Sequence, residues 1–218
     1  MMLNMISGLD GAISIDGVSG GLGGPADASV FGAIRAVADV ILVGAGTVIA
    51  ENYRRPQTPP SVQEARAARG QAPLPTVAIV SNSLSLPPDH RVLDPDHRPY
   101  ILTNAAAPEA RRATLAAHAE IIDVGAAAVD LNIAARELGA RGADVVLVEG
   151  GPTLNGAVVD ADLLDELCLT LSPLVIGGDG PRMVSGASAT ADRRFRLDRV
   201  LHADELTFLR YLRARNDD

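Results

Sequence analysis

The chain of 218 residues is 47% hydrophobic but only 3% aromatic, so its core must be built mainly from Ala, Val, Leu and Ile. Its formal net charge of −8 argues against a general nucleic-acid binder, because such proteins normally carry a basic surface. All 19 of its Lys and Arg residues are arginine, which excludes a P-loop lysine and a Schiff-base lysine.

Other classes of protein are excluded by what the sequence lacks. The single cysteine, Cys168, rules out a disulfide framework and a cysteine-based zinc site. We interpret it as a buried, inert thiol, with a nucleophile as the alternative. Apolar runs fall short of the roughly 18 residues of a membrane span, and the N-terminus lacks the features of a signal peptide. We therefore expect one cytoplasmic domain over residues 1–218, with no membrane, nucleic-acid or metal partner.

Apolar runs alternate with helical patterns along the chain. Runs without polar alternation predict buried strands at residues 40–43, 76–80 and 145–148, and further strands are predicted at 3–7, 100–103, 119–124 and 166–171. Helical spacing predicts helices that begin near residues 25, 48, 61, 108, 131 and 153. Alternation over 196–203 and 205–213 predicts a terminal hairpin. The predicted fold class is α/β, three-layer αβα, with a mixed, mostly parallel sheet and a C-terminal antiparallel hairpin.

Three local expectations accompany this outline. Residues 12–16 are predicted to return as an extended segment after a turn. Phe31, Ile34 and Val37 recur at helical spacing and should face the core. Residues 183–194 are expected to be loosely structured.

The loop 17–25 is rich in glycine, and two interpretations of it remain open. It is either a mobile connector or a segment whose bare backbone lies against a ligand. The sequence pattern alone does not separate them.

A further glycine segment follows the predicted strand at 145–148, where Glu149, Gly150 and Gly151 precede Pro152. Glycine lets a ligand approach the backbone closely, and proline fits the first turn of a helix. The free N–H groups and the dipole at the start of that helix favour an anion such as a phosphate. Because open α/β sheets bind ligands at the carboxyl ends of their strands, the sequence predicts a ligand site here.

The predicted strand at 40–43 ends in a similar turn at 44–47. This turn is not the dinucleotide fingerprint GxGxxG, because Ile49 occupies the third glycine position. Alone it is a weak phosphate signal, but a second strand–glycine–threonine junction strengthens the prediction.

Few residues offer chemistry of their own. The histidines are scattered, and His118 and Glu120 match only half of a zinc deaminase motif whose other half needs two cysteines. Asp10 and Glu149, at predicted strand ends, are acid–base candidates, although a carboxylate there is more often a hydrogen-bonding anchor. A polar pocket without a nucleophile or a metal suits an imported cofactor that supplies the chemistry.

Four ordered segments, 4–11, 43–48, 149–154 and 159–171, resemble the riboflavin-pathway pyrimidine reductase family. This is the reductase domain of the bifunctional riboflavin deaminase/reductase, and the chain is similar to its stand-alone, actinobacterial-type members. The resemblance implies a dihydrofolate reductase-like fold and a homodimer. It also implies NADPH-dependent reduction of 5-amino-6-(5-phosphoribosylamino)uracil or a close analogue, in which hydride reaches C1′ of the ring-opened imine and gives the ribitylamino product.

The same resemblance implies roles for individual residues. Glu149 is expected where nicotinamide meets substrate, and Asp10 is expected to position the base or relay a proton. The residues implied to bind NADPH are Ser7, Gly44, Ala45, Gly46, Thr47, Ser81, Gly150, Gly151, Pro152, Thr153, Leu154 and Asn155. Those implied to bind the substrate, with the two arginines as candidates for its phosphate, are Arg35, Glu51, Asn52, Tyr53, Arg54 and Glu149.

The sequence departs from the family in two places. Gly8 takes the place of the serine in the usual Ser-Leu-Asp-Gly, and the region of Arg54 and Arg55 differs locally, which leaves the substrate open. The 218 residues hold no deaminase domain, so we do not expect the preceding deamination from this chain. Two alternatives also stay open: a reductase of a related heterocycle such as dihydrofolate, and a catalytically silent nucleotide-binding protein.

Overall fold

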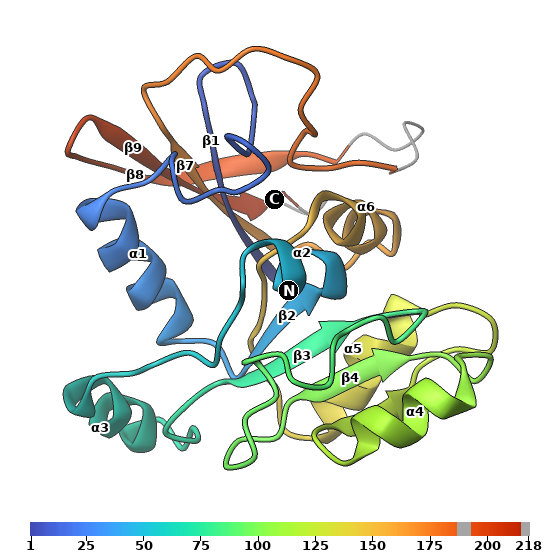
Figure 1. Ribbon diagram of the computed structural model, residues 1–218. Coiled ribbons are helices and arrows are strands. Elements are labelled where there is room, and N and C mark those ends of the chain that lie inside the picture. Colours follow the sequence, from blue (N-terminus) through green and yellow to red (C-terminus); the bar gives the residue numbers. More distant parts are fainter. Residues whose placement is uncertain (187–192, 215–218) are drawn as a thin grey trace. The chain divides into compact units, whose positions relative to one another are not determined.

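The computed structural model describes residues 1–186 and 193–214, and the chain divides into two compact units (Figure 1). The first unit comprises Met1–Ile34 and Val148–Asp218, and the second comprises Arg35–Leu147. The expectation of a single domain over residues 1–218 stays a prediction. Of the segment expected to be loosely structured, residues 187–192 lie outside the described residues.

Parallel strands form the centre of the second unit, in the order β5-β4-β3-β2. The first residues of β2 and β3, Val40 and Thr76, pair with each other, so the carboxyl ends of these strands meet at one edge. The strands lie close to their predicted bounds: β2 (Val40–Gly44), β3 (Thr76–Val80), β4 (Tyr100–Thr103) and β5 (Glu120–Asp123).

The helices of the second unit are α2 (Ala45–Ala50), α3 (Pro60–Ala68), α4 (Glu109–Ala116) and α5 (Leu131–Ala140). Helix α5 is capped by Asp130, whose carboxylate accepts hydrogen bonds from the backbone N–H groups of Asn132 and Ile133. Helix α2 begins at Ala45 rather than near residue 48, because the extended Gly44 at the end of β2 already serves as its N-cap.

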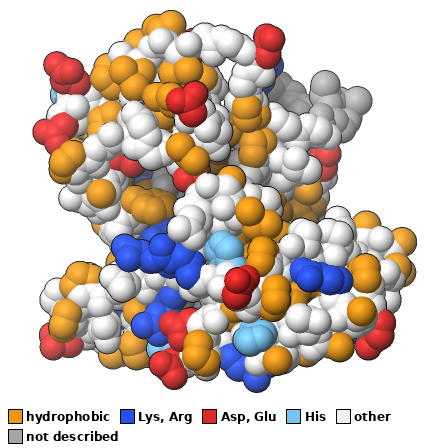
Figure 2. Space-filling model, in the orientation of Figure 1, with side chains coloured by type: hydrophobic (Ala, Val, Ile, Leu, Met, Phe, Trp, Pro, Cys, Tyr) orange, Lys and Arg blue, Asp and Glu red, His pale blue; other side chains and the backbone are white. Residues whose placement is uncertain are grey.

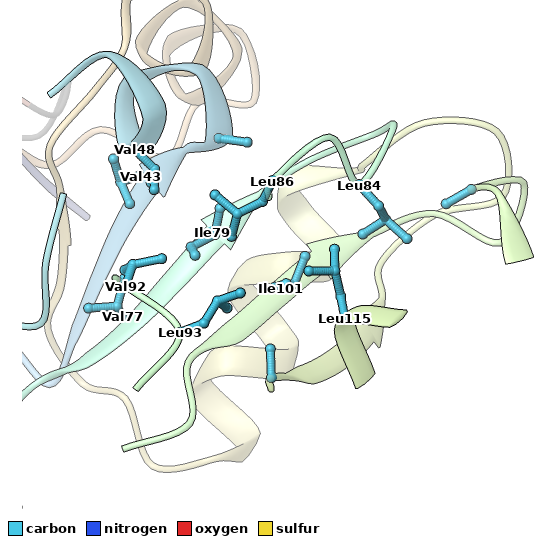
Figure 3. Packing of buried hydrophobic residues seen from close by; sticks show 13 residues of the cluster. Val43, Val48, Val77, Ile79, Leu84, Leu86, Val92, Leu93, Ile101 and Leu115 are labelled. Carbon is cyan, nitrogen blue, oxygen red and sulfur yellow. The ribbon is translucent and has the colours of Figure 1, made fainter. Parts of the chain in front are cut away.

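Aliphatic side chains form the core of the second unit (Figure 3). Val43, Ile79 and Ile101 from adjacent strands gather with Leu115 of α4 and Leu84 of the loop after β3. These side chains are at most 1% exposed, and burying each one stabilises the folded state by about 1.5–3 kcal/mol. The composition predicted this kind of core, because aromatic residues are so few.

In the first unit, β1 runs parallel to β7, β9 runs antiparallel to β7, and β8 completes the terminal hairpin. Ser7 and Leu171 face each other at the carboxyl ends of β1 and β7. The predicted hairpin is confirmed, with an irregularity in its pairing between Leu197 and Arg199. The bounds are β1 (Met2–Ser7), β7 (Glu166–Leu171), β8 (Phe195–Ala203) and β9 (Leu206–Arg213).

Two helices accompany these strands, α1 (Pro25–Arg35) and α6 (Pro152–Asp160). Val37 lies beyond the end of α1 and is 43% exposed, so the prediction that it faces the core is wrong. The extended segment predicted at residues 12–16 forms only an isolated bridge between Ile15 and Val18.

Strand β6 (Val146–Val148) carries the chain from the second unit back to the first. Just before it, the carboxylate of Asp39 accepts hydrogen bonds from the backbone N–H groups of Asp144 and Val145, at 3.0 and 2.8 Å. Acidic and basic side chains are interspersed on the molecular face shown in Figure 2. No helix within the described residues is long and apolar enough to cross a membrane.

Candidate active site

The glycine segment after β6 opens helix α6, as predicted. Gly150 has a φ of 92°, which requires glycine, and the peptide bond between Gly150 and Gly151 is cis. Pro152 occupies the first turn, and no side chain caps the helix at Gly151. The backbone N–H groups of this first turn therefore have no side-chain cap, and N–H groups in this position bind anions at the N-termini of other helices. Glu149, half-buried, immediately precedes the turn.

The loop after β7 is tied to the start of α6. The fully buried Asn155 donates a hydrogen bond of 2.7 Å to the carbonyl of Met183, and the N–H of Ser185 donates to the carbonyl of Pro152 at 3.1 Å. The Oδ1 atom of Asn155 is buried and has no partner among the described residues. Asn155 thus anchors a loop, and its predicted contact with a cofactor stays a prediction.

Asp10 anchors the same loop through a second set of hydrogen bonds. Its exposed carboxylate accepts hydrogen bonds from the N–H groups of Gly177 and Ile176, at 2.6 and 2.8 Å. The bond from Gly177 is the main reason why the pKa of Asp10 lies below its ordinary value. A carboxylate held in its ionised form is a poor proton donor, so this geometry supports a positioning role.

The glycine at position 8, where the family has serine, is explained by this loop. A Cβ atom added to Gly8 would lie 2.8 Å from the carbonyl oxygen of Leu174 and 2.8 Å from Cδ1 of Ile176. A distance of 2.8 Å is too short between a Cβ atom and a carbonyl oxygen, so a side chain at position 8 would force the loop that contains Leu174 to move. The N–H of Leu9 donates to the same carbonyl of Leu174 at 2.8 Å, so the two segments lie in direct contact.

Ser7 and Ser81 lie at strand ends, as predicted, one in each unit. Ser7 is 6% exposed, and its carbonyl accepts a hydrogen bond of 2.8 Å from the N–H of Ser172. Ser81 is 5% exposed, and its N–H donates to the carbonyl of Leu102 at 3.0 Å. Both main chains are therefore fixed by neighbouring strands or loops.

In the second unit, Gly44 is the N-cap of α2, and residues 45–47, which were predicted as a turn, form the first turn of this helix. No side chain caps the helix at Gly44, and Gly46 is exposed, so that a Cβ atom added to it would have no atom within 4 Å. Ala45 is buried, whereas Thr47 is partly exposed. The start of α2 therefore has backbone that no side chain caps, and the predicted cofactor contact of this segment stays a prediction.

The predicted substrate residues cluster at the end of α2. Asn52 has a φ of 44°, and the N–H of Tyr53 returns to the carbonyl of Val48 at 2.9 Å. Arg35 donates a hydrogen bond of 2.6 Å to the hydroxyl of Tyr53 and lies 5.4 Å from its ring centroid. The structure thus brings together Arg35 and Tyr53, which are far apart in sequence, and it leaves Arg54 exposed.

The neighbouring arginine is engaged elsewhere. Arg55 forms an ion pair with Asp94 at 3.1 Å and contacts the ring of His97. Glu51 is half-buried at the C-cap of α2. Of the pair at 54 and 55, Arg54 is therefore the better candidate for a phosphate.

His90 was not predicted as a site residue, yet it joins the loop after β3 to helix α2. Its Nδ1 accepts a hydrogen bond of 3.2 Å from the N–H of Val92, and the backbone of Val48 in α2 raises its pKa against the larger, opposite effect of burial. Burial lowers the pKa of His90 below its ordinary value. The proline-rich sequence around it gave no sign of this contact.

Asp27 is a second residue that the sequence indicated only as the start of a helix. Burial raises the pKa of Asp27 above its ordinary value, and the side chain of Thr170 in β7 opposes part of this shift. An available signal was its position four residues before Phe31 and seven before Ile34, because an acid on the apolar face of a helix is unusual.

Cys168 is a buried thiol, as expected. Burial, reinforced by the neighbouring Glu166, raises its pKa to about 12. A thiol with so high a pKa is not a nucleophile near neutral pH.

Comparisons with known proteins agree with this architecture. The profile of the family described as the RibD C-terminal domain matches residues 1–209. The 2,5-diamino-6-ribosylamino-4(3H)-pyrimidinone 5′-phosphate reductase of Methanothermobacter thermautotrophicus is 32% identical over 188 residues, which cover 85% of this chain and 83% of that protein. A pyrimidine reductase-like protein from Corynebacterium diphtheriae superposes with a TM-score of 0.90 and 27% identity, over 99% of this chain and 92% of the other.

A more distant likeness concerns the fold alone. Dihydrofolate reductase from Enterococcus faecalis, solved with NADP(H), superposes with a TM-score of 0.51 at 12% identity, over 99% of this chain and 96% of the other. The predicted fold class, a mostly parallel sheet with a C-terminal antiparallel hairpin and flanking helices, is confirmed.

Proposed function

The chain belongs to the family of the RibD C-terminal domain, and from this premise we propose that it is an NADPH-dependent reductase of a phosphorylated ribosylaminopyrimidine. The named relatives are reductases of the riboflavin pathway. The observation that carries the proposal for this chain is the uncapped start of α6, directly after Glu149 at the end of a buried strand. That arrangement offers an anion site beside an acid, as a dinucleotide cofactor next to a reacting centre requires.

The residues present fit a dinucleotide phosphate. The first turn of α6 carries backbone N–H groups that no side chain caps, and Gly46 leaves its turn open to an approaching group. We assign to the cofactor the set predicted from the sequence: Ser7, Gly44, Ala45, Gly46, Thr47, Ser81, Gly150, Gly151, Pro152, Thr153, Leu154 and Asn155. NADPH would supply the hydride, and the chain would bind, orient and shield it.

The chain's own residues have separate tasks in the reaction. Hydride addition to C1′ of the open-chain imine converts its C=N bond to a single bond, and the nitrogen then takes one proton. We assign Glu149 to the reacting centre, with Arg35 and Arg54 as the cations for the substrate phosphate. Asp10 acts through the loop that it anchors. Glu51, Asn52 and Tyr53 complete the proposed substrate set.

The substrate is a phosphorylated pyrimidine. The name of the archaeal relative specifies a 2,5-diamino-pyrimidinone, which differs from the phosphoribosylaminouracil by an amino group in place of an oxygen. Dihydrofolate is not favoured, because the likeness to dihydrofolate reductase extends to the fold alone.

Loss of NADPH absorbance in the near ultraviolet tests the proposal. The purified chain should oxidise NADPH with either phosphoribosylaminopyrimidine and not with dihydrofolate. Glu149→Ala should abolish turnover while leaving the Kd of NADPH little changed. Tight NADPH binding without turnover of any pyrimidine would instead identify a silent nucleotide-binding protein, and full activity of Glu149→Ala would remove Glu149 from the reacting centre.

We also propose a cytoplasmic homodimer that has no nucleic-acid or membrane partner. Strand β8 exposes the apolar side chains of Leu197, Val200 and Leu201, each about half accessible, and exposed apolar side chains are common at subunit interfaces. Light scattering that gives the mass of two chains would support the dimer, whereas the 22.6 kDa mass of one chain would contradict it.

A further inference from the structure

The segment 36–39, between α1 and β2, is held in place by side chains from a different part of the chain. Helix α1 ends at Arg35 and β2 begins at Val40, so this segment is the main chain that directly follows Arg35. It lies in the second unit, together with helix α3 and the loop after that helix. Because Arg35 is proposed to bind the substrate phosphate, contacts that fix this segment also fix the base of that side chain.

Arg66, in the last turn of α3, makes the buried contacts with this segment. Its side chain is fully buried, and its Nη1 donates hydrogen bonds to the carbonyl oxygens of Ala36 and Ala38, at 3.0 and 2.7 Å. Its Nε donates to the carbonyl oxygen of Ala72 at 2.8 Å. One guanidinium therefore joins the segment after α1 to the loop after α3.

Two further side chains bind the same segment nearer the surface. The exposed Arg69 donates from Nη2 to the carbonyl oxygen of Ala36 at 2.8 Å, and from Nε to Oε1 of Gln71 at 3.0 Å. Gln71 donates from Nε2 to the carbonyl oxygen of Val37 at 3.0 Å and to Oδ1 of Asp39 at 2.7 Å. Together with the bonds from α3, all four residues of the segment thus accept a side-chain hydrogen bond.

A buried guanidinium at position 66 is unfavourable in itself. Burial lowers the pKa of Arg66, and the charge of Asp39 offsets only part of this effect. Its hydrogen bonds go to backbone carbonyl oxygens, and its Nη2 is buried without a partner among the described residues. Apolar side chains in place of buried ionic groups are often neutral or stabilising. The arginine is therefore better explained by the geometry that it imposes on the segment than by stability.

The side chain of Arg35 is fixed at its other end by Tyr53. Its guanidinium donates a hydrogen bond of 2.6 Å to the hydroxyl of Tyr53 and lies 5.4 Å from the centre of the ring. Ordering a long side chain when a ligand binds lowers the affinity, whereas a guanidinium that is already aligned loses less freedom. A fixed main chain at one end and a tyrosine hydroxyl at the other provide this alignment.

We propose that Arg66, Arg69 and Gln71 are positioning residues, which hold the segment 36–39 so that Arg35 is aligned for the 5′-phosphate of the substrate. Their effect on the substrate passes through Arg35. The inference rests on the proposed function and names the residues that set the phosphate affinity of that same site.

Arg69→Met tests the proposal, because Arg69 is exposed and its replacement leaves Arg66 in place. The full chain is titrated calorimetrically, with NADP⁺ present, against 5-amino-6-(5-phosphoribosylamino)uracil and against the same compound without its phosphate. The variant should bind the phosphorylated compound about 3- to 10-fold more weakly, with KM raised and kcat retained. The Kd of the compound without phosphate and the Kd of NADPH should not change. An unchanged affinity for the phosphorylated compound, or equal losses for all ligands, would overturn the proposal.

A double-mutant cycle shows whether the effect passes through Arg35. In the Arg35→Ala background, Arg69→Met should change the Kd of the phosphorylated compound by less than about two-fold, because no guanidinium is left to align. The same loss in both backgrounds would mean that Arg69 acts independently of Arg35, which contradicts the proposal. Arg136→Met, the same replacement at an exposed position of α5, is the matched control and should change none of these constants.

Two more variants separate alignment from charge. Arg69→Lys keeps the cation, but a single ammonium group does not reproduce the two hydrogen bonds of the guanidinium fork. It should therefore recover only part of the affinity, and full recovery would assign the effect to charge alone. Gln71→Met removes no charge, yet it should weaken binding of the phosphorylated compound in the same way, and an unchanged Kd would contradict the proposal. All titrations are made well below Tm, so that reduced stability alone leaves Kd unchanged.

Failure of the proposed function gives a different pattern. If no pyrimidine is turned over but the phosphorylated compound binds, the calorimetric comparison still tests Arg69, because binding does not need hydride transfer. If the parent chain binds neither compound, the positioning roles fall together with the substrate class. Turnover by the parent with an unchanged Arg69→Met variant overturns the positioning roles alone.

Discussion

The carboxylate of Asp10 accepts a hydrogen bond of 2.6 Å from the backbone N–H of Gly177, 167 positions later in the chain. A second hydrogen bond, from the backbone N–H of Ile176, means that Asp10 holds the loop after β7 in place. Two roles were open for this residue, an anchor and a proton relay, and they predict different kinetics.

For an anchor, Asp10→Asn should lower kcat/KM only a few-fold, because the amide oxygen still accepts one of the two N–H groups. The dependence of kcat on pH should keep its shape. Removal of a general acid would instead lower kcat by about 10²- to 10⁴-fold. Steady-state kinetics at several pH values distinguish these outcomes. If the pH profile of kcat lost one of its two limbs in the variant, Asp10 would be a proton relay and not an anchor.

Gly8→Ser should destabilise the first unit, although serine is the residue usual in the family. The new Cβ would lie 2.8 Å from the carbonyl oxygen of Leu174, so the loop must move. We expect a loss of about 1–3 kcal/mol, or roughly 2–10 °C in Tm. Gly24→Ser is the matched control, because no atom lies within 4 Å of its Cβ position. A Gly8→Ser variant as stable as its parent would contradict this account.

The stability of the protein should fall at mildly acidic pH because of His90. Burial lowers its pKa in the folded state below the ordinary 6.5, so the unfolded chain binds the proton first as the pH falls. The stability that His90 contributes is complete above pH 6.5 and is lost as the pH falls through the lower, folded-state pKa.

Thermal unfolding at neutral and mildly acidic pH measures this effect. His90→Gln should narrow the difference in Tm between the two conditions, whereas His118→Gln, at an exposed position, should leave it as in the parent. If Tm fell by the same amount at acidic pH in the parent and in His90→Gln, the pH dependence would come from other groups.

Thr47→Ala and Arg35→Ala should separate the two ligands. Loss of one hydrogen bond to the cofactor should raise the Kd of NADPH about 5-fold in Thr47→Ala. Arg35→Ala should raise KM for the phosphorylated substrate and leave NADPH binding little changed, because its cation is lost. Tyr53→Phe removes the hydroxyl that holds Arg35 but keeps the ring, and it should give a smaller change in KM. Equal effects of Thr47→Ala and Arg35→Ala on both ligands would refute the assignment.

The sequence was informative where a structure depends on local patterns. Strands β3 and β4 have the predicted bounds, because their apolar residues form short runs between prolines and polar turns. The same pattern misled at Val37, since helical spacing continued past Arg35 although the helix had ended. The turn at Gly150 was predicted well, because glycine marks a position where the backbone has a positive φ, whereas the turn predicted at 44–47 belongs largely to helix α2.

Composition, patterning and four ordered motifs thus determined the α/β class, the glycine turns and the family of this protein. Only the tertiary structure decided what Asp10 does, because its carboxylate accepts hydrogen bonds from backbone N–H groups in a distant part of the chain. Such pairs leave no periodic signal, since the fold, and not the spacing along the sequence, brings the donor to the acceptor. The structure also turned an apparent departure, Gly8, into a packing requirement of the loop that Asp10 holds.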